Sequence, residues 1–145
     1  MALREEVLEK LKRKQAEQFA SCLPQADNPL VVVKDEVPRE IFRCLDRFIK
    51  YEAKPNAILE NRFLLKNLFI YFENINDKNV LLHTNQLYWK FFLRFNVSNI
   101  NDLISYLIKI NTTELCLVNL DDGYIFYLSE EENNYWLFKE KLSNC

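Results

Sequence analysis

The sequence predicts a single α+β domain over residues 1–145, with about five helices and a small antiparallel sheet. Three observations support this prediction. The chain has 145 residues, of which 49% are hydrophobic and 14% aromatic, so it can bury a core of its own. Apolar residues recur at helical spacing in several segments. Near the C-terminus an Asp-Asp-Gly turn between two strand-like segments predicts a hairpin over about 113–128, followed by a terminal helix.

The first third of the chain predicts two helices around a short strand. Helical spacing of apolar residues indicates a helix over 3–20, and the turn-forming segment 21–29 ends it. The β-branched residues at 30–33 favour a short strand. Pro38 suits the first position of a second helix that runs to about residue 53. The apolar stripes are Leu3, Val7, Leu8, Leu11 and Phe19 in the first helix, and Ile41, Phe42, Leu45, Phe48 and Ile49 in the second.

The middle of the chain is ambiguous between helix and strand. Over 57–74 the spacing favours a helix to about Lys66 and then a buried strand over 68–73, although periodicity cannot separate the two in so short a run. A strand over 80–82 and a helix from Thr84 or Asn85 to about Phe95 follow. This helix would carry Trp89 among the aromatic residues of the core.

The last third predicts a helix, a hairpin and a final helix. Ser98 is expected to cap a helix with the apolar stripe Ile100, Leu103, Ile104, Leu107 and Ile108. The hairpin pairs 114–119 with 124–128, and Gly123 supplies the positive φ that its turn requires. Ser129 is expected to start the terminal helix, because a capping hydroxyl is followed by three glutamates in the first turn.

The scarcity of glycine and histidine argues against most catalytic architectures. The chain has one glycine and one histidine, whereas phosphate-binding loops need several glycines and common catalytic zinc sites need several histidines or closely spaced cysteines. His83 and Cys116 could form a thiol–imidazole pair, but a core thiol between Leu115 and Leu117 is the preferred interpretation. We therefore expect no catalytic residue, no metal ligand and no cofactor.

Charge and cysteine usage indicate a cytoplasmic protein. The chain starts with charged residues and holds no apolar segment of about 20 residues, so neither a secretory signal nor a membrane span is expected. The four cysteines are widely spaced, and we expect free thiols in a reducing cytosol. The net charge of −2 and the pI of about 5.5 argue against direct binding of nucleic acid.

Acidic and aromatic residues gather near the C-terminus. Residues 113–145 carry seven acidic and two basic side chains, a distribution typical of a solvated surface or of a surface for a basic partner. Tyrosine and tryptophan next to acids are common at binding hot spots, although packing of the last helix would also explain them. The candidate partner-binding residues are Asp121, Asp122, Tyr124, Glu130, Glu131, Glu132, Tyr135 and Trp136.

The segment 121–128, together with Asn133-Asn134-Tyr135-Trp136, resembles the immunity proteins of bacterial contact-dependent growth inhibition and related polymorphic toxin systems. These are small cytosolic α+β domains without catalytic motifs. The resemblance implies stoichiometric binding and neutralisation of a cognate toxin C-terminal domain, often a nuclease. The alternative is a non-catalytic regulatory or scaffolding module. The oligomeric state is left open by the sequence.

Overall fold

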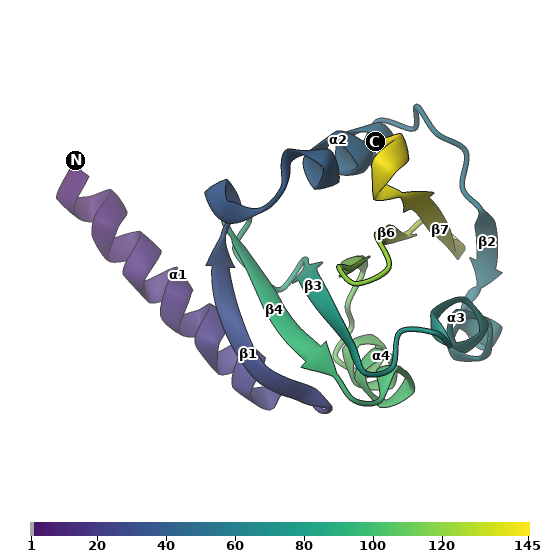
Figure 1. The fold of residues 1–145 in the computed structure, drawn as a ribbon, viewed down its shortest axis with the longest axis horizontal. Coiled ribbons are helices and arrows are strands. Elements are labelled where there is room, and N and C mark those ends of the chain that lie inside the picture. The colour runs from purple at the N-terminus through teal and green to yellow at the C-terminus, as the bar shows by residue number, and fades with distance from the viewer. Residues whose placement is uncertain (1) are drawn as a thin grey trace.

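The computed structural model describes residues 2–145 as four α-helices and one seven-stranded antiparallel sheet (Figure 1). The strand order is β1-β4-β3-β5-β6-β7-β2. The helices are α1 (Ala2–Cys22), α2 (Arg39–Ile49), α3 (Leu64–Phe72) and α4 (Ile100–Lys109). The strands are β1 (Ala26–Val33), β2 (Ala57–Glu60), β3 (Lys78–Thr84), β4 (Phe91–Val97), β5 (Glu114–Asn119), β6 (Tyr124–Glu130) and β7 (Asn134–Lys141). The predicted fold of about five helices, a small sheet and a terminal helix is therefore wrong.

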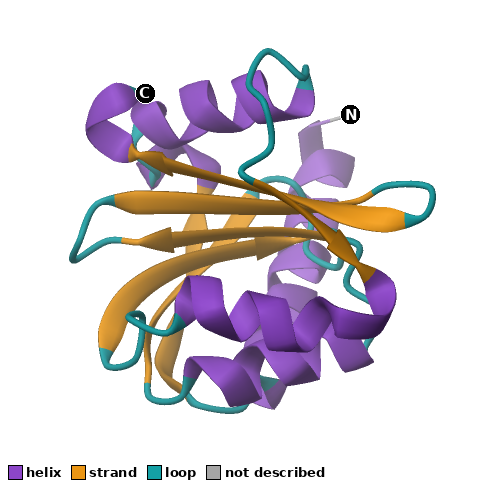
Figure 2. Ribbon diagram, turned by 90° about the vertical axis from the view of Figure 1, so that its right-hand side faces the viewer, coloured by secondary structure: helices purple, strands orange, loops and turns teal. Residues whose placement is uncertain are grey.

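Helices cover both faces of the sheet (Figure 2). On one face α1, α3 and α4 contribute to a larger core, which receives Leu82, Leu117 and Leu128 from the strands. On the other face α2 covers a smaller core, which receives Leu81, Val118 and Phe138. Since side chains alternate between the two faces, a strand covered on both sides is apolar at nearly every position. Such strands lose the polar–apolar alternation that identifies a strand in a sequence.

The segment predicted as a helix from residue 84 or 85 to Phe95 is a turn followed by strand β4. Phe91, Leu93 and Phe95 belong to the larger core and Phe92 to the smaller one, so the dense apolar run comes from burial on two faces. Trp89, which was expected in the core, lies in the turn before β4 and is exposed.

The ambiguous region 57–74 has the opposite order from the one that the sequence favoured. Residues Ala57–Glu60 form the edge strand β2, which pairs with β7. The expected strand over 68–73 is instead most of helix α3, and Leu64, Leu68 and Phe72 are its buried residues. Their spacing of four residues places them on one face of a helix, which decides the ambiguity.

The expected terminal helix is strand β7. Ser129 lies within β6, and Glu130 ends that strand. The following turn is closed by the backbone N–H of Glu131, which donates to the carbonyl oxygen of Asn134 at 2.7 Å. Tyr135 and Leu137 then pack against the larger core, whereas Trp136 and Phe138 face the smaller one. This alternation suits a strand, and it outweighs the helix-start pattern of a serine followed by three glutamates.

The remaining elements were predicted, with shifted ends. The first two helices and the strands near 30–33, 80–82, 114–119 and 124–128 are present, and Gly123 has φ of +73° in the hairpin turn. The second helix ends at Ile49 rather than near residue 53. The fourth helix is capped by Asn99, not Ser98, because the Asn99 side chain accepts a hydrogen bond from the backbone N–H of Asp102.

Helix α1 packs only in part through the apolar stripe that the sequence predicted: Phe19 is partly buried against the larger core, whereas the side chain of Leu3 lies outside the described residues. Its buried residues are Ala16 and Ala20, near the C-terminal end. Val7, Leu8 and Leu11 are exposed, and Figure 1 shows the N-terminal half of the helix projecting beyond the sheet.

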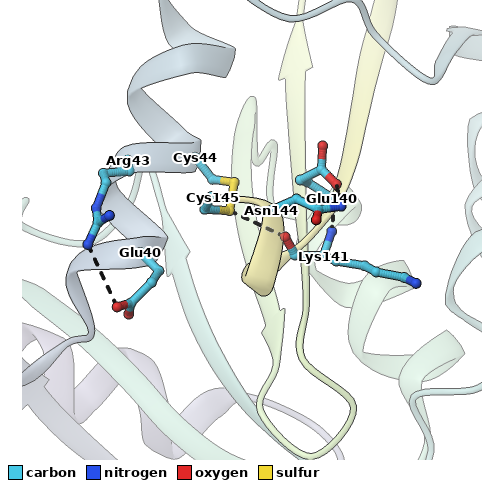
Figure 3. Close-up of a disulfide and its surroundings, with 7 residues drawn as sticks. All are labelled: Glu40, Arg43, Cys44, Glu140, Lys141, Asn144 and Cys145. Atoms are coloured by element: carbon cyan, nitrogen blue, oxygen red, sulfur yellow. Dashed lines mark hydrogen bonds and ion pairs between the residues drawn. A yellow bond between two sulfur atoms is a disulfide. The ribbon is translucent and has the colours of Figure 1, made fainter.

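Two of the four cysteines form a disulfide, contrary to the expectation of free thiols. Cys44 of α2 is bonded to Cys145, which follows the short 3-10 helix Leu142–Asn144 (Figure 3). The bond joins positions 101 residues apart and fastens the end of the chain to the helix on the smaller core. Cys116 is a buried free thiol and Cys22 an exposed one.

Candidate protein-binding site

The predicted partner-binding residues fall into two groups at opposite ends of β6. Asp121, Asp122 and Tyr124 lie at or before its start, and Glu130, Glu131 and Glu132 lie at or beyond its end. A strand of seven residues spans about 20 Å at roughly 3.3 Å per residue. One small contact therefore cannot include both groups, and each must be considered separately.

The two acids of the hairpin turn, Asp121 and Asp122, contact residues of the neighbouring strands β3 and β5. Asp121 accepts hydrogen bonds from the backbone N–H of Asn79, at 2.8 Å, and from its side-chain amide. These bonds hold the pKa of the Asp121 carboxyl below its ordinary value. Asp122 accepts a hydrogen bond from the Asn119 side chain and lies 3.6 Å from the Lys78 ammonium. Their carboxylates therefore already have partners within the chain.

The second group surrounds the turn between β6 and β7. Glu130 and Tyr135 are opposite each other in the ladder, as are Ser129 and Trp136. Since neighbouring positions of a strand face opposite sides of the sheet, Tyr135 and Trp136 point to different faces. Trp136 lies on the side of α2, where Glu131, Glu132 and Asn133 join it around a hollow of about 360 Å³.

Tyr51, at the end of α2, completes this group and was missed by the sequence reasoning. Its hydroxyl donates to Glu131 Oε1 at 3.0 Å, and this bond raises the pKa of Tyr51 above its ordinary value. Its ring meets the edge of Trp136 with the centroids 5.4 Å apart. Ile49 lies beside them over a small cavity that Glu131 also lines. We name Ile49, Tyr51, Glu131, Glu132 and Trp136 the acidic–aromatic patch.

Tyr51 occupies a backbone conformation that its side chain disfavours. Helix α2 ends in a Schellman motif, in which Tyr51 N–H donates to the Phe48 carbonyl and Glu52 N–H to the Arg47 carbonyl. The residue in the left-handed conformation of this motif is usually glycine or asparagine. Tyr51 holds that position with φ of +56°, and a bulky residue there costs about 1–2 kcal/mol.

Helix α4 ends in the same motif and serves as a comparison within the chain. There Asn111 has φ of +64° and donates its N–H to Ile108, while Thr112 N–H bonds to the Leu107 carbonyl. Asparagine tolerates this conformation well. The two helices therefore use one motif, with a suitable residue in α4 and an unsuitable, 59% exposed tyrosine in α2.

His83 and Cys116, the candidate thiol–imidazole pair, are opposite neighbours in the β3–β5 ladder. Cys116 is buried, and burial, together with the charge of Glu114, raises the pKa of its thiol well above the ordinary value. The His83 ring donates through Nδ1 to the Phe91 carbonyl at 2.8 Å and packs on Phe92. The two groups are therefore adjacent, but the surroundings oppose the thiolate that nucleophilic chemistry needs.

The burial of His83 predicts a pH-dependent stability. Burial lowers its pKa below 6.5, although the bond to Phe91 and the charge of Glu114 act in the opposite direction. The unfolded chain binds a proton near pH 6.5 while the folded chain resists it, so this stability is complete above that pH and is lost as the pH falls toward the folded pKa. Urea midpoints measured from about pH 7.5 to about pH 5.5 should fall more for the wild type than for His83→Gln. If the urea midpoints of the wild type and His83→Gln fall equally with pH, His83 is not the source of the pH dependence.

Within residues 2–145, no three His, Cys, Asp or Glu side chains are grouped so as to hold a metal ion. No helix in this range is both long and apolar enough to cross a membrane. Comparisons of the chain with protein-family models, with curated proteins and with solved structures return no match.

Proposed function

We propose that this protein is an immunity protein, which binds a cognate toxin domain stoichiometrically through the acidic–aromatic patch and neutralises it. The observation that supports this proposal is the exposed Tyr51 ring, held in a disfavoured backbone conformation between Glu131 and Trp136. Strained residues that the surrounding structure over-determines are concentrated at functional sites. Binding of a partner gives a reason for a tyrosine where glycine would relieve the strain.

The composition of the patch favours a basic protein surface as the partner. Tyrosine and tryptophan supply large contact areas at low cost in side-chain entropy and are enriched among hot-spot residues. The carboxylate of Glu132 is exposed and forms no hydrogen bond or ion pair with another residue in 2–145, so its charge is available to attract cations. A toxin domain that binds nucleic acid through lysine and arginine would present such a surface.

The immunity function is tested by co-expressing this chain with the C-terminal domain of the protein encoded immediately upstream. We expect a one-to-one complex and rescue of cell growth from the toxicity of that domain. If growth is not rescued and the two proteins do not associate, the immunity function is contradicted.

Two variants test the patch itself by calorimetric titration of that complex. Tyr51→Gly should lower the affinity at least about tenfold, while the free energy of unfolding stays within about 1 kcal/mol of the wild type, because relief of strain offsets the lost contacts. Glu132→Lys should weaken the complex in a salt-dependent manner. The control Glu73→Lys changes the net charge equally at one exposed position outside the patch. Unchanged affinity in both patch variants would place the interface elsewhere.

A further inference from the structure

The N-terminal half of α1 exposes apolar side chains on the side that faces away from the sheet. Val7, Leu8 and Leu11 are 51%, 45% and 55% exposed. The helix packs on the larger core through Ala16 and Ala20. Since successive residues of an α-helix are turned by about 100°, Val7 and Leu11 lie opposite these two alanines. The apolar stripe of a surface helix usually faces the core, so its exposure here requires a separate explanation.

Exposed basic side chains without partners flank these apolar residues. Lys10 and Lys14 line one shallow hollow of the helix surface together with Val7 and Leu11. Arg4 is seven positions before Leu11, which places the two on the same side of the helix. None of the three basic side chains forms a hydrogen bond or ion pair with another residue in 2–145. We name Arg4, Val7, Lys10, Leu11 and Lys14 the outer face of α1.

The acidic residues of α1 are turned toward the rest of the molecule or are already paired. Glu9 accepts a hydrogen bond from the Lys90 ammonium at 2.8 Å, and this bond and the charge of Glu5 both raise the pKa of Lys90. Glu6 lines the hollow between α1 and the turn before β4. The fourth acid, Glu17, forms an ion pair within the helix at 3.6 Å. The outer face of α1 therefore presents positive charge and apolar surface to solvent.

This combination matches the surface of a membrane that contains anionic lipids. Apolar side chains of an amphipathic helix enter the boundary between headgroups and acyl chains, while lysine and arginine are attracted to the anionic headgroups. A nucleic acid would pair with the cations but would leave Val7 and Leu11 against its charged backbone. Figure 1 shows α1 along one outer side of the molecule, with no other element beyond it, so a flat surface can contact the outer face along its length.

We propose that the outer face of α1 binds peripherally to a lipid bilayer that contains anionic lipid, with the helix lying in the plane of the interface. So few apolar side chains give weak and reversible binding that depends on the anionic headgroups. Helix α1 lies against β1, at one edge of the sheet, whereas the acidic–aromatic patch lies by β7 near the other edge (Figure 1). Membrane binding therefore leaves the patch accessible and is independent of the proposed immunity function.

Co-sedimentation with lipid vesicles tests the membrane contact. Vesicles of phosphatidylcholine with about one third phosphatidylglycerol should bind the wild type, and vesicles of phosphatidylcholine alone should bind it at least about tenfold more weakly. Leu11→Glu should bind the anionic vesicles at least about tenfold more weakly than the wild type. The matched control Ile70→Glu, at an exposed apolar residue of α3, should bind like the wild type. A wild type that does not bind the anionic vesicles, or that binds both kinds equally, would overturn the proposal.

A charge-reversal experiment separates lipid from other polyanions. Lys10→Glu/Lys14→Glu should bind the anionic vesicles at least about tenfold more weakly than the wild type. The control Lys54→Glu/Lys66→Glu changes the net charge equally at exposed positions outside α1 and should lose much less. If the Lys10/Lys14 variant loses binding while Leu11→Glu keeps it, the outer face attracts polyanions in general, nucleic acid included, and the lipid assignment is wrong. Folding of each variant is checked by its circular dichroism spectrum and thermal unfolding.

Discussion

Breaking the disulfide between Cys44 and Cys145 should lower the free energy of unfolding by about 4 to 5 kcal/mol. The bond joins positions 101 residues apart, so it restricts more than two thirds of the unfolded chain. In the chain-entropy account, the stabilisation grows with the logarithm of loop length. The expected effect is large because breaking the bond removes a constraint that spans from α2 to the last residue.

The measurement is urea unfolding of the wild type with and without a thiol reductant, and of Cys145→Ala without one. Cys145→Ala leaves the buried Cys44 thiol in place, so it removes the link without emptying the core at that position. Cys22→Ala, at an exposed free thiol, is the matched control and should unfold like the wild type. Equal urea midpoints for the oxidised and reduced wild type would contradict a stabilising bond.

The disulfide also illustrates why pairing over long distances escapes sequence reasoning. Cys44 and Cys145 lie in no spacing pattern, and four cysteines allow three different complete pairings. Only the position of α2 over the smaller core, opposite the end of β7, brings the two thiols together. Disulfides are rare in a reducing cytosol, so the bond between Cys44 and Cys145 contradicts the expectation of four free thiols.

Local signals predicted the elements that one segment determines by itself. The Asp121–Gly123 turn and its two strands, the helix that Pro38 precedes and the helix over 100–109 all depend on turn geometry, capping or periodicity within a few residues. The failures share a different cause. Strands β4 and β7 are covered on both faces, and the run from Phe91 to Phe95 is equally consistent with a buried helix until the positions of α1 and α2 are known.

The candidate site was found in part for a similar reason. Glu130, Glu131, Glu132 and Trp136 were selected from composition, but their placement on a helix was wrong, and Asp121 and Asp122 could not be separated from them without the length of β6. Tyr51 has a weak signal in the sequence, because α2 ends without a glycine or asparagine to take the left-handed position. In a chain with one glycine, five other residues of the described range adopt positive φ, and Tyr51 is the aromatic one among them.

The core beneath the patch leads to the second large prediction. Phe138 is 1% exposed, and its ring stacks on Phe48 at a centroid distance of 5.0 Å and lies 6.0 Å from Tyr127. Phe138→Ala should lower the free energy of unfolding by about 3–5 kcal/mol, since it removes a large side chain from a packed interior. On the other face of the sheet, the ring centroids of Phe72 and Phe126 are 4.9 Å apart. Phe72→Ala should lower the free energy of unfolding by a similar amount.

The comparison of these two variants separates local support of the patch from stability in general. Phe48 immediately precedes Ile49 in α2, and Trp136 lies 6.5 Å from the Phe138 ring, so a cavity at Phe138 loosens both sides of the patch. Measured well below the unfolding temperature, Phe138→Ala should bind the proposed toxin partner about tenfold more weakly, while Phe72→Ala should bind like the wild type. If either alanine variant fails to fold, Phe138→Leu and Phe72→Leu are compared instead. Each should lower the free energy of unfolding by about 1–2 kcal/mol. Equal losses of affinity in both would show that stability alone governs binding, and would remove the acidic–aromatic patch from its proposed role.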